Sequence, residues 1–497
     1  MKILTQGIST IIILAMLSVM AASCGGGGDL YDAEKDLFNA RKMNRELVVA
    51  SMNREFLTRT LAAYRGIVDK YEDKRGNIEG MEMIVVSALM ELAELEFRAG
   101  MIEEARNDFA VVADMKETIT EARANAIWSA GYISLELDDY ASSLRFFEMF
   151  VSEYLTPDKA EATFHMNSRY LVTPVRIAGI HSNLGAEKDS GRWLGKAEKI
   201  FNDLIASSTD SLLVRETRYN LLTALLQGKK WNEARTTIAG MKQLYRNPSD
   251  IPSLLFLESR TLTEGLGRPE RAIPLLKEII DEYPDSHQTL PAMIDIAGIY
   301  FTRGELRKAE KIYNEIIEEH GGVTAQAAEA AWQLARIAES ENDWVSAALH
   351  YKLTYTHYPA TIQGMEAPLR IVTHFRELGE KEATTSAFDR AMEQFKKLIS
   401  DQYNKSIRIL AEEYIVRAFS EDGRWDEAAE HLLGLPAKYP DYHKFRGNYL
   451  LAASIFEKEL GDKDRATEIL TECIGKYPDS GIDAEAQKQI DRIRDSR

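Results

Sequence analysis

The sequence predicts an all-α protein in which about eleven helical pairs stack into a solenoid and a final helix caps the open end. Helix-forming residues dominate, and the apolar–polar alternation typical of strands is scarce. A small residue recurs mostly every 36 to 38 residues, and a bulky residue follows it four positions later. A fixed period of this size is the mark of a repeat architecture.

Each repeat unit has a physical logic that is clearest between residues 269 and 322. Ala272 and Ala309 lie 37 residues apart, and the bulky Leu276 and Tyr313 follow them at the same offset. The small side chain lets the two helices of a pair cross closely, while the bulky residue lies on the same helix face and fills the core. The small position is predicted at Thr60, Ala105, Ser143, Ala197, Ala234, Ala272, Ala309, Ala347, Ala383, Ala428 and Ala466.

Proline and glycine separate the predicted helices. Tyr283-Pro284 and Tyr477-Pro478 follow second helices. Proline cannot continue a helix, and it biases the residue before it toward an extended conformation. Gly304 is predicted to form the turn inside one pair, and Asp285 or Ser286 to cap the helix that follows the proline.

This pattern resembles the tetratricopeptide repeat, which has an aromatic residue, a Leu-Gly-like pair and a Tyr on its first helix, then an Ala, a bulky residue four positions on and a closing Pro. The resemblance implies a right-handed solenoid whose concave face is lined by the first helices and binds protein or peptide partners. It is clearest in the units centred on Ala272, Ala309, Ala347, Ala428 and Ala466.

The first 23 residues resemble a secretory signal peptide. The apolar run from Ile8 to about Ala22 is shorter than the about 20 residues that a membrane-spanning helix needs. The tetrapeptide Ala21-Ala22-Ser23-Cys24 resembles the bacterial lipobox, which implies that Cys24 is acylated and that residues 24–30 form a glycine-rich tether. The alternative is a plain secreted protein that is cleaved near this point.

The rest of the chain divides into four predicted parts. Residues 31–155 hold the N-terminal repeats, and residues 196–482 hold the main array. Between them, residues 156–195 break the regular spacing, which predicts an irregular hinge or loop region. The polar segment 483–497 suits a capping helix on the open end of the stack.

The charge of the chain favours protein partners. The formal net charge is −17, and no basic stripe with interleaved aromatic residues is present. Such a surface repels nucleic acid and anionic lipid headgroups. We therefore expect no nucleic-acid partner, while the oligomeric state stays open.

The sequence carries no constellation typical of catalysis, cofactor binding or metal binding. Gly191–Lys196 resembles a phosphate-binding loop only faintly, because its spacer is one residue short and no strand precedes it. His350 and His357 are two turns apart on one predicted helix, but a metal site needs a further ligand and a supporting shell. Cys473 occupies a core position, which indicates a buried inert thiol. We predict a protein that is not an enzyme and that needs no cofactor or metal.

Large aromatic and arginine side chains at inner positions of the first helices are the candidate contacts with a partner. These residue types anchor many interfaces. The alternative is that they pack between repeats as ordinary core. The predicted partner-binding residues are Trp128, Tyr132, Tyr219, Trp332 and Arg336.

Together these features predict a lipid-anchored scaffold on the periplasmic face of the bacterial outer membrane. The repeated Tyr-Pro-Asp-Ser endings resemble those of repeat lipoproteins of the β-barrel assembly machine and of the Tol-Pal-associated coordinator of cell-wall synthesis. This implies a role in outer-membrane protein assembly or cell-envelope coordination. The alternatives are a SusD-type glycan-binding lipoprotein, which would need long aromatic loops, and an envelope enzyme, which would need paired carboxylates in a cleft.

Overall fold

The computed structural model describes residues 28–49, 53–116, 118, 120–245, 250–322, 324–400, 402–440, 442–478 and 481–495. Within these residues the protein is entirely helical, with 24 α-helices and no strand, so the predicted all-α class is confirmed. None of the described helices combines the length and the apolar character needed to cross a membrane. The predicted signal peptide, Cys24 and the tether up to Gly27 lie outside the described residues.

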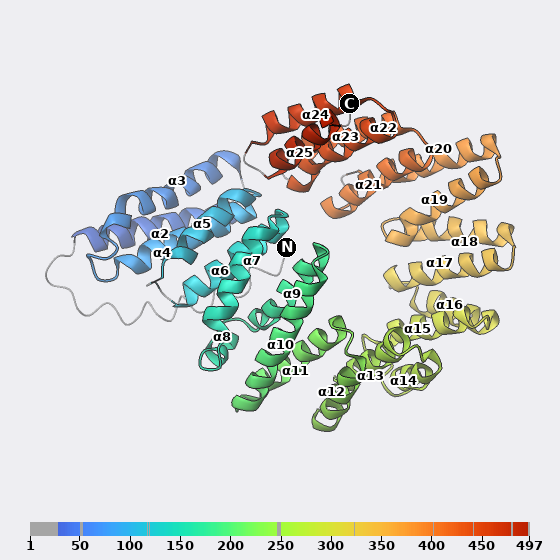
Figure 1. Cartoon of the computed structure of the whole chain (residues 1–497), viewed down its shortest axis with the longest axis horizontal. Helices are drawn as coiled ribbons and strands as arrows, with labels where there is room; N and C mark the ends of the chain where they lie inside the picture. The colour runs from blue at the N-terminus through green and yellow to red at the C-terminus, as the bar shows by residue number, and fades with distance from the viewer. Residues whose placement is uncertain are drawn as a thin grey trace. The chain divides into compact units, whose positions relative to one another are not determined.

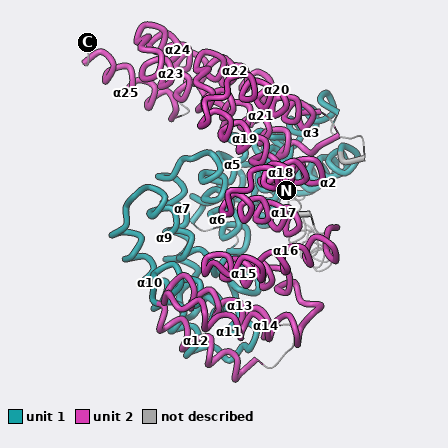
Figure 2. Tube along the Cα trace, turned by 90° about the vertical axis from the view of Figure 1, so that its right-hand side faces the viewer, with its two compact units in different colours: residues 1–230 teal, residues 231–497 magenta. Residues whose placement is uncertain are grey.

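The chain forms two compact units that divide between Lys230 and Trp231 (Figure 2). The helices of the first unit follow one another in chain order (Figure 1). They are α2 (Gly28–Val49), α3 (Arg54–Tyr71), α4 (Met81–Arg98), α5 (Ile102–Asp114), α6 (Thr120–Glu136), α7 (Tyr140–Tyr154), α8 (Ala160–Met166), α9 (Thr173–Asn183), α10 (Glu187–Ser207) and α11 (Ser211–Gln227), with the 3-10 turns η1 (Glu72–Lys74) and η2 (Ser168–Val172).

The second unit continues the same alternation. It also contains one π-helical turn, η3 (Thr261–Gly265), and one 3-10 turn, η4 (His443–Gly447). Its α-helices are α12 (Trp231–Leu244), α13 (Ile251–Arg260), α14 (Pro269–Glu282), α15 (Thr289–Thr302), α16 (Leu306–His320), α17 (Thr324–Ser340), α18 (Trp344–His357), α19 (Ile362–Glu377), α20 (Lys381–Leu398), α21 (Lys405–Glu421), α22 (Trp425–Lys438), α23 (Asn448–Lys458), α24 (Lys463–Lys476) and α25 (Ile482–Asp495).

Small residues lie on the second helix of each pair, as the repeat register predicts. Ala309 on α16 is fully buried, and Tyr313, four positions later, is 1% exposed. Both belong to one apolar cluster with residues of α15 and α17. The other small positions that are fully buried are Thr60, Ala105, Ser143, Ala197, Ala234, Ala272, Ala347, Ala428 and Ala466.

The prediction was wrong by one residue on α20. Ala383, the predicted small position, is only half-buried, whereas the next residue, Thr384, is buried. Phe388, four positions after Thr384, fills the bulky position at 4% exposure. The Thr384 hydroxyl donates to the Glu380 carbonyl oxygen at 2.9 Å, so a residue with a polar group can take the small position without leaving that group unpaired.

The two helices of a pair are joined by one recurring turn. In Gly304, the predicted turn residue, φ is 73°, and the Glu305 N–H donates to the Tyr300 carbonyl oxygen at 2.9 Å. A residue with a left-handed φ, followed by a hydrogen bond to the carbonyl oxygen five residues earlier, is the Schellman motif. Glycine adopts the left-handed conformation with little strain, so it is the favoured residue in this motif. In the described residues the corresponding positive φ occurs at Gly100, Asp138, Gly185, Lys229, Gly267, Gly304, Asn342, Gly379, Gly423 and Gly461.

Tyr-Pro pairs end second helices, as predicted. Tyr283, Tyr358, Tyr439 and Tyr477 are all C-cap residues, with φ between −133° and −125°. The proposed helix-capping role of Ser286 takes a different form. Its hydroxyl accepts from the Gln288 N–H at 3.2 Å, ahead of α15, and therefore stabilises the turn that leads into the helix.

Within each unit, the first helices of several successive pairs pack directly against one another. In the first unit α4 contacts α2 and α6, and in the second unit α17 contacts α15 and α19. Among the described residues, successive second helices make no comparable contacts. Each stack therefore curves toward its first helices, which line its inner face.

The segment predicted as irregular, residues 156–195, holds α8, η2, α9 and the first turns of α10 inside the first unit. The seven-residue helix α8 does not belong to any pair, and α7 contacts α9 directly. The inserted residues therefore lie beside the stack and lengthen the spacing between Ser143 and Ala197. At the C-terminus, α25 packs on α24 through Ala486, Ile490 and Ile493.

The predicted position of Ala309 at the crossing of two helices can be tested by its effect on stability. Replacing Ala309 by Leu adds bulk between α15 and α16, and we expect the free energy of unfolding to fall by about 1–3 kcal/mol. Ala325→Leu is the matched control, because Ala325 is exposed on α17. Chemical denaturation of both variants measures the difference, and equal stability would contradict the register.

Candidate functional site

The inner face of the first unit carries a compact group of aromatic side chains, which we call the Trp128 cluster. The rings of Trp128 and Tyr132 stack on α6, with centroids 5.6 Å apart and planes 8° apart. Phe147 of α7 and Tyr170 of η2 lie 6.3 and 5.7 Å from Trp128. Together with Arg176 of α9, these residues define the cluster.

The sequence of α6 positions this cluster. Near its N-terminus, the buried Arg123 pairs with Glu153 of α7 and donates to the Ala113 carbonyl oxygen at 2.9 Å. Gly131 lets α6 approach α7 closely, because a Cβ there would lie 2.9 Å from the ring of Phe147. The Ser143 hydroxyl donates to the Gly131 carbonyl oxygen at 2.8 Å. One face of Trp128 is therefore fixed against α7.

Arg176 brings a positive charge to the aromatic rings. Its guanidinium carbon lies 5.8 Å from the ring centroid of Trp128, 5.7 Å from that of Tyr132 and 5.9 Å from that of Phe147. Burial lowers the pKa of Arg176 from its ordinary value, although Tyr132 and Glu136 oppose this effect. A guanidinium remains charged in proteins, so the cluster holds a half-buried cation.

Two donors in this cluster have no acceptor within the described part of the chain. Trp128 is only 8% exposed, and its indole Nε1 is unpaired. The Nε atom of Arg176 is buried and unpaired as well. Because a buried donor without an acceptor costs about 1–3 kcal/mol, the arrangement favours a bound group with an oxygen acceptor.

The structure brings two predicted residues, Trp128 and Tyr132, into one site. Tyr132 is half-buried, and its pKa is raised by burial and by the negative charge of Glu136. Tyr219 lies half-buried on α11, a later first helix of the unit, where its carbonyl oxygen accepts from the Thr223 hydroxyl. Arg176 was not predicted, because it lies in the stretch where the repeat spacing fails.

The other two predicted residues lie on α17 in the second unit. Trp332 is half-buried, packs on the apolar cluster around Ala347 and has its ring centroid 4.9 Å from that of Tyr351. Arg336, one turn later, is exposed, and its guanidinium lies 5.4 Å from the centre of the Phe301 ring. Trp332 thus contributes to the core with one part of its ring, and Arg336 projects from the same helix.

Several residues considered for chemistry have structural roles. Gly191–Lys196 lies within α10 and forms no loop. Nδ1 of His357 lies 3.0 Å from the carbonyl oxygen of Leu353 on the same helix. Cys473 is fully buried, so the prediction of a buried thiol is confirmed, and burial raises the pKa of this thiol to about 11.

Two family models described as tetratricopeptide repeat match residues 265–334 and residues 448–480. These parts of the chain therefore contain tetratricopeptide repeats, and they include three of the predicted small positions, Ala272, Ala309 and Ala466. No curated protein matches the chain significantly.

Solved helical-repeat proteins are similar at low sequence identity. A tetratricopeptide repeat protein from Parabacteroides merdae is 12% identical with a TM-score of 0.36, over 56% of this chain and 92% of its own. Yeast Tom70 is 10% identical with a TM-score of 0.35, over 94% and 97%. A human IFIT1 dimer with m7Gppp-AAAA is 13% identical with a TM-score of 0.31, over 79% and 85%.

Proposed function

We propose that this chain, which contains tetratricopeptide repeats, is a lipid-anchored scaffold of the bacterial envelope that holds protein partners on its inner helical face. The Trp128 cluster is the observation that carries the proposal. It combines the partly exposed ring of Tyr132, which stacks on the buried Trp128, with a half-buried guanidinium and two donors that have no acceptor within the described residues. A backbone carbonyl oxygen or a carboxylate of a peptide would accept from the guanidinium of the half-buried Arg176.

The guanidinium of Arg176 is central to this proposal, because arginine and tryptophan dominate the binding energy of many interfaces. Replacing Arg176 by Met keeps the aliphatic volume and removes the charge and the donors. We expect at least about a tenfold loss of partner capture, corresponding to about 1.4 kcal/mol. Crosslinking in native membranes followed by quantitative mass spectrometry measures the partners bound per folded molecule.

The control for this experiment is Arg192→Met. Arg192 is an exposed arginine of α10 that pairs with Asp189 on its own helix at 2.9 Å. The control should capture the same partners as the unchanged protein. Equal capture by Arg176→Met and Arg192→Met would show that partners do not use the Trp128 cluster.

The envelope part of the proposal rests on the first 24 residues, where a signal-like apolar run precedes Cys24. We place the anchor on the periplasmic face of the outer membrane, with a role in outer-membrane protein assembly or cell-envelope coordination. Replacing Cys24 by Ser removes the acylated thiol and should release the protein from membranes almost completely. Membrane fractionation and sucrose-gradient separation of inner and outer membranes provide the measurement.

Cys473→Ser is a matched control, because Cys473 is the second of the two cysteines and is buried in α24. This variant should remain in the membrane fraction. If Cys24→Ser also remains there, the lipid anchor is excluded.

A further inference from the structure

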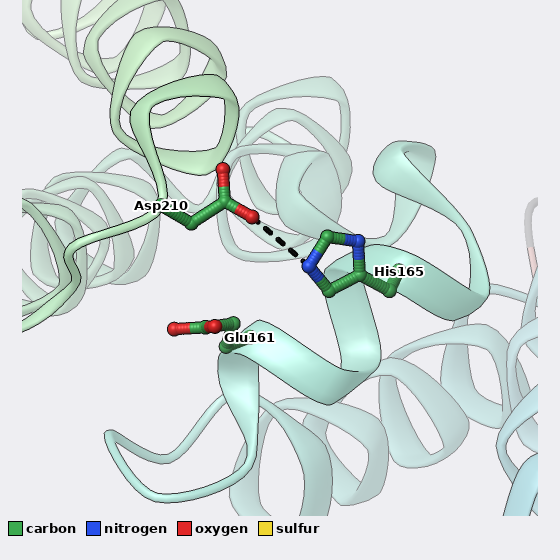
Figure 3. Close-up of side chains that lie close together, drawn as sticks. All are labelled: Glu161, His165 and Asp210. Carbon is green, nitrogen blue, oxygen red and sulfur yellow. Dashed lines mark ion pairs between the residues drawn. The ribbon is translucent and has the colours of Figure 1, made fainter.

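Three side chains with metal-ligating atoms meet where α8 approaches the start of α11. Glu161 and His165 are four residues apart on α8 and therefore share one face of that helix. Asp210 is the N-cap residue of α11. Figure 3 shows the three side chains converging, and one ligand atom from each lies within 4.8 Å of the others.

The positions of the two carboxylates are set by contacts that leave oxygen atoms free. The Oδ1 atom of Asp210 accepts from the N–H groups of Leu212 and Leu213 at 2.8 and 3.0 Å. Its Oδ2 atom lies 2.9 Å from Nε2 of His165. Oε2 of Glu161 accepts from the Ser208 hydroxyl at 3.3 Å, and the oxygen of that hydroxyl accepts from the backbone N–H of Asp210 at 3.0 Å.

The charge of this group is not balanced by a basic residue. Within the described residues, no lysine or arginine forms an ion pair with Glu161 or Asp210. Elsewhere in the same unit, carboxylates in comparable positions pair with arginine, as Glu153 does with Arg123. Two carboxylates beside one imidazole therefore carry a net negative charge, which favours a bound cation.

The donor set selects the kind of cation. Imidazole nitrogen suits zinc and other transition metals, whereas calcium and magnesium prefer oxygen ligands alone. Zinc bonds to nitrogen at about 2.0–2.1 Å and to carboxylate oxygen at about 2.0–2.2 Å, and three protein ligands plus a water complete its tetrahedron. Glu161 and His165 are exposed and can adjust their rotamers to reach this geometry around the half-buried Asp210.

We propose that Glu161, Nε2 of His165 and Oδ2 of Asp210 form a Zn²⁺ site that fastens α8 to α11. The site explains how the chain holds a helix that belongs to no pair. It is separate from the proposed partner contacts at Trp128 and does not depend on them. The N-cap bonds to Oδ1 orient Asp210 in the way that outer-shell hydrogen bonds orient metal ligands.

The experiment titrates Zn²⁺ into the full chain, which is purified without a histidine tag and stripped with a chelator. Calorimetry gives the affinity, and Co²⁺ absorption reports the coordination geometry. We compare three variants. His165→Ala and Asp210→Asn remove ligands, and Asp210→Asn keeps an N-cap, because asparagine caps helices as well as aspartate does. His287→Ala removes an exposed histidine of the second unit as a control.

We expect one Zn²⁺ to bind the unchanged chain and His287→Ala with equal affinity. The affinity of His165→Ala and of Asp210→Asn for Zn²⁺ should be at least roughly tenfold lower. Zn²⁺ should also raise the melting temperature of the unchanged chain more than that of His165→Ala. Co²⁺ should give the intense absorption of a tetrahedral site. Equal Zn²⁺ affinity in the unchanged chain and His165→Ala, or no binding to either, would overturn the proposal. Circular dichroism confirms that each variant is folded.

Discussion

Glu412→Ala is expected to lower the free energy of unfolding by about 3 kcal/mol, because it removes a buried carboxylate on which several groups depend. The Glu412 side chain is fully buried on α21. One of its oxygens lies 2.7 Å from Nε2 of His431, and the other accepts from the Tyr439 hydroxyl at 2.9 Å and pairs with Lys438 at 2.6 Å. The carboxylate thus joins α21 to the middle and the C-terminal end of α22.

The size of this effect follows from the unpaired group and the cavity that remain when the Glu412 side chain is removed. Without Glu412, the hydroxyl of Tyr439, a residue that is 7% exposed, loses its acceptor, and a cavity opens in the same place. Glu413→Ala is the matched control, since Glu413 is the next residue on α21 and is exposed. Urea unfolding should separate the two variants clearly, and similar midpoints would refute this account.

The pH dependence provides a second test. Burial opposes ionisation of Glu412, but hydrogen bonds from His431, Lys438 and Tyr439 outweigh it and lower its pKa below 4.5. A carboxyl whose pKa is lower in the folded state contributes stability above its unfolded pKa and loses it as the pH falls through the folded value. The stability difference between the unchanged protein and Glu412→Ala should therefore shrink in acid below about pH 4.5.

Glu96→Gln should stabilise the protein at mildly alkaline pH, because it removes a buried carboxylate that lies beside a second carboxylate. Glu96 on α4 and Asp108 on α5 are 3% and 5% exposed. Arg65 of α3 binds both oxygens of Asp108 at 2.8 and 2.6 Å and reaches Glu96 at 3.2 Å. Burial and the neighbouring charge of Asp108 raise the pKa of Glu96 to about 8, and Arg65 offsets only part of this.

The direction of the pH effect follows from proton binding. Between the ordinary pKa of 4.5 and about 8, the folded protein keeps the Glu96 proton and the unfolded chain does not. Stability is therefore highest below pH 4.5 as far as this group is concerned, and it falls as the pH rises to about 8. Glutamine stays neutral at every pH, so this variant lacks the pH dependence that Glu96 contributes.

Denaturation at several pH values between 5 and 9 measures this effect. The decrease in the free energy of unfolding with rising pH should be smaller in Glu96→Gln. It should remain in Glu148→Gln, which changes an exposed glutamate of α7 in the same unit. The same slope in both variants would mean that Glu96 ionises normally. Arg65 then would be pairing with two charged carboxylates rather than with one.

The repeat register was readable from sequence because its physical cause is local. A small residue at a helix crossing and a bulky residue one turn later leave the same signature in every unit, as at Ala272 and Leu276. The register failed at Ala383 because Thr384 satisfies its hydroxyl within its own helix and can replace alanine. Composition alone does not distinguish these two adjacent positions.

The candidate sites were less predictable, because they bring together residues that the repeat register does not connect. Trp128 and Tyr132 could be singled out because they occupy inner positions of a regular first helix. Arg176 joins them from a segment with irregular spacing, so no register placed it. Glu161 and His165 are four residues apart, so the sequence alone places them on one face of a helix. The position of Asp210 beside them depends on the path of the chain between α8 and α11, which the sequence does not reveal.

The packing of helices in chain order also bears on how the protein reaches its native state. Most contacts join elements that are adjacent along the polypeptide, so little loop-closure entropy opposes their formation, and such topologies fold quickly for their size. Folding can nucleate in any pair and spread to its neighbours. Amide hydrogen exchange should then be slowest in the middle of each unit and fastest in its terminal helices, because each end helix has a neighbour on one side only.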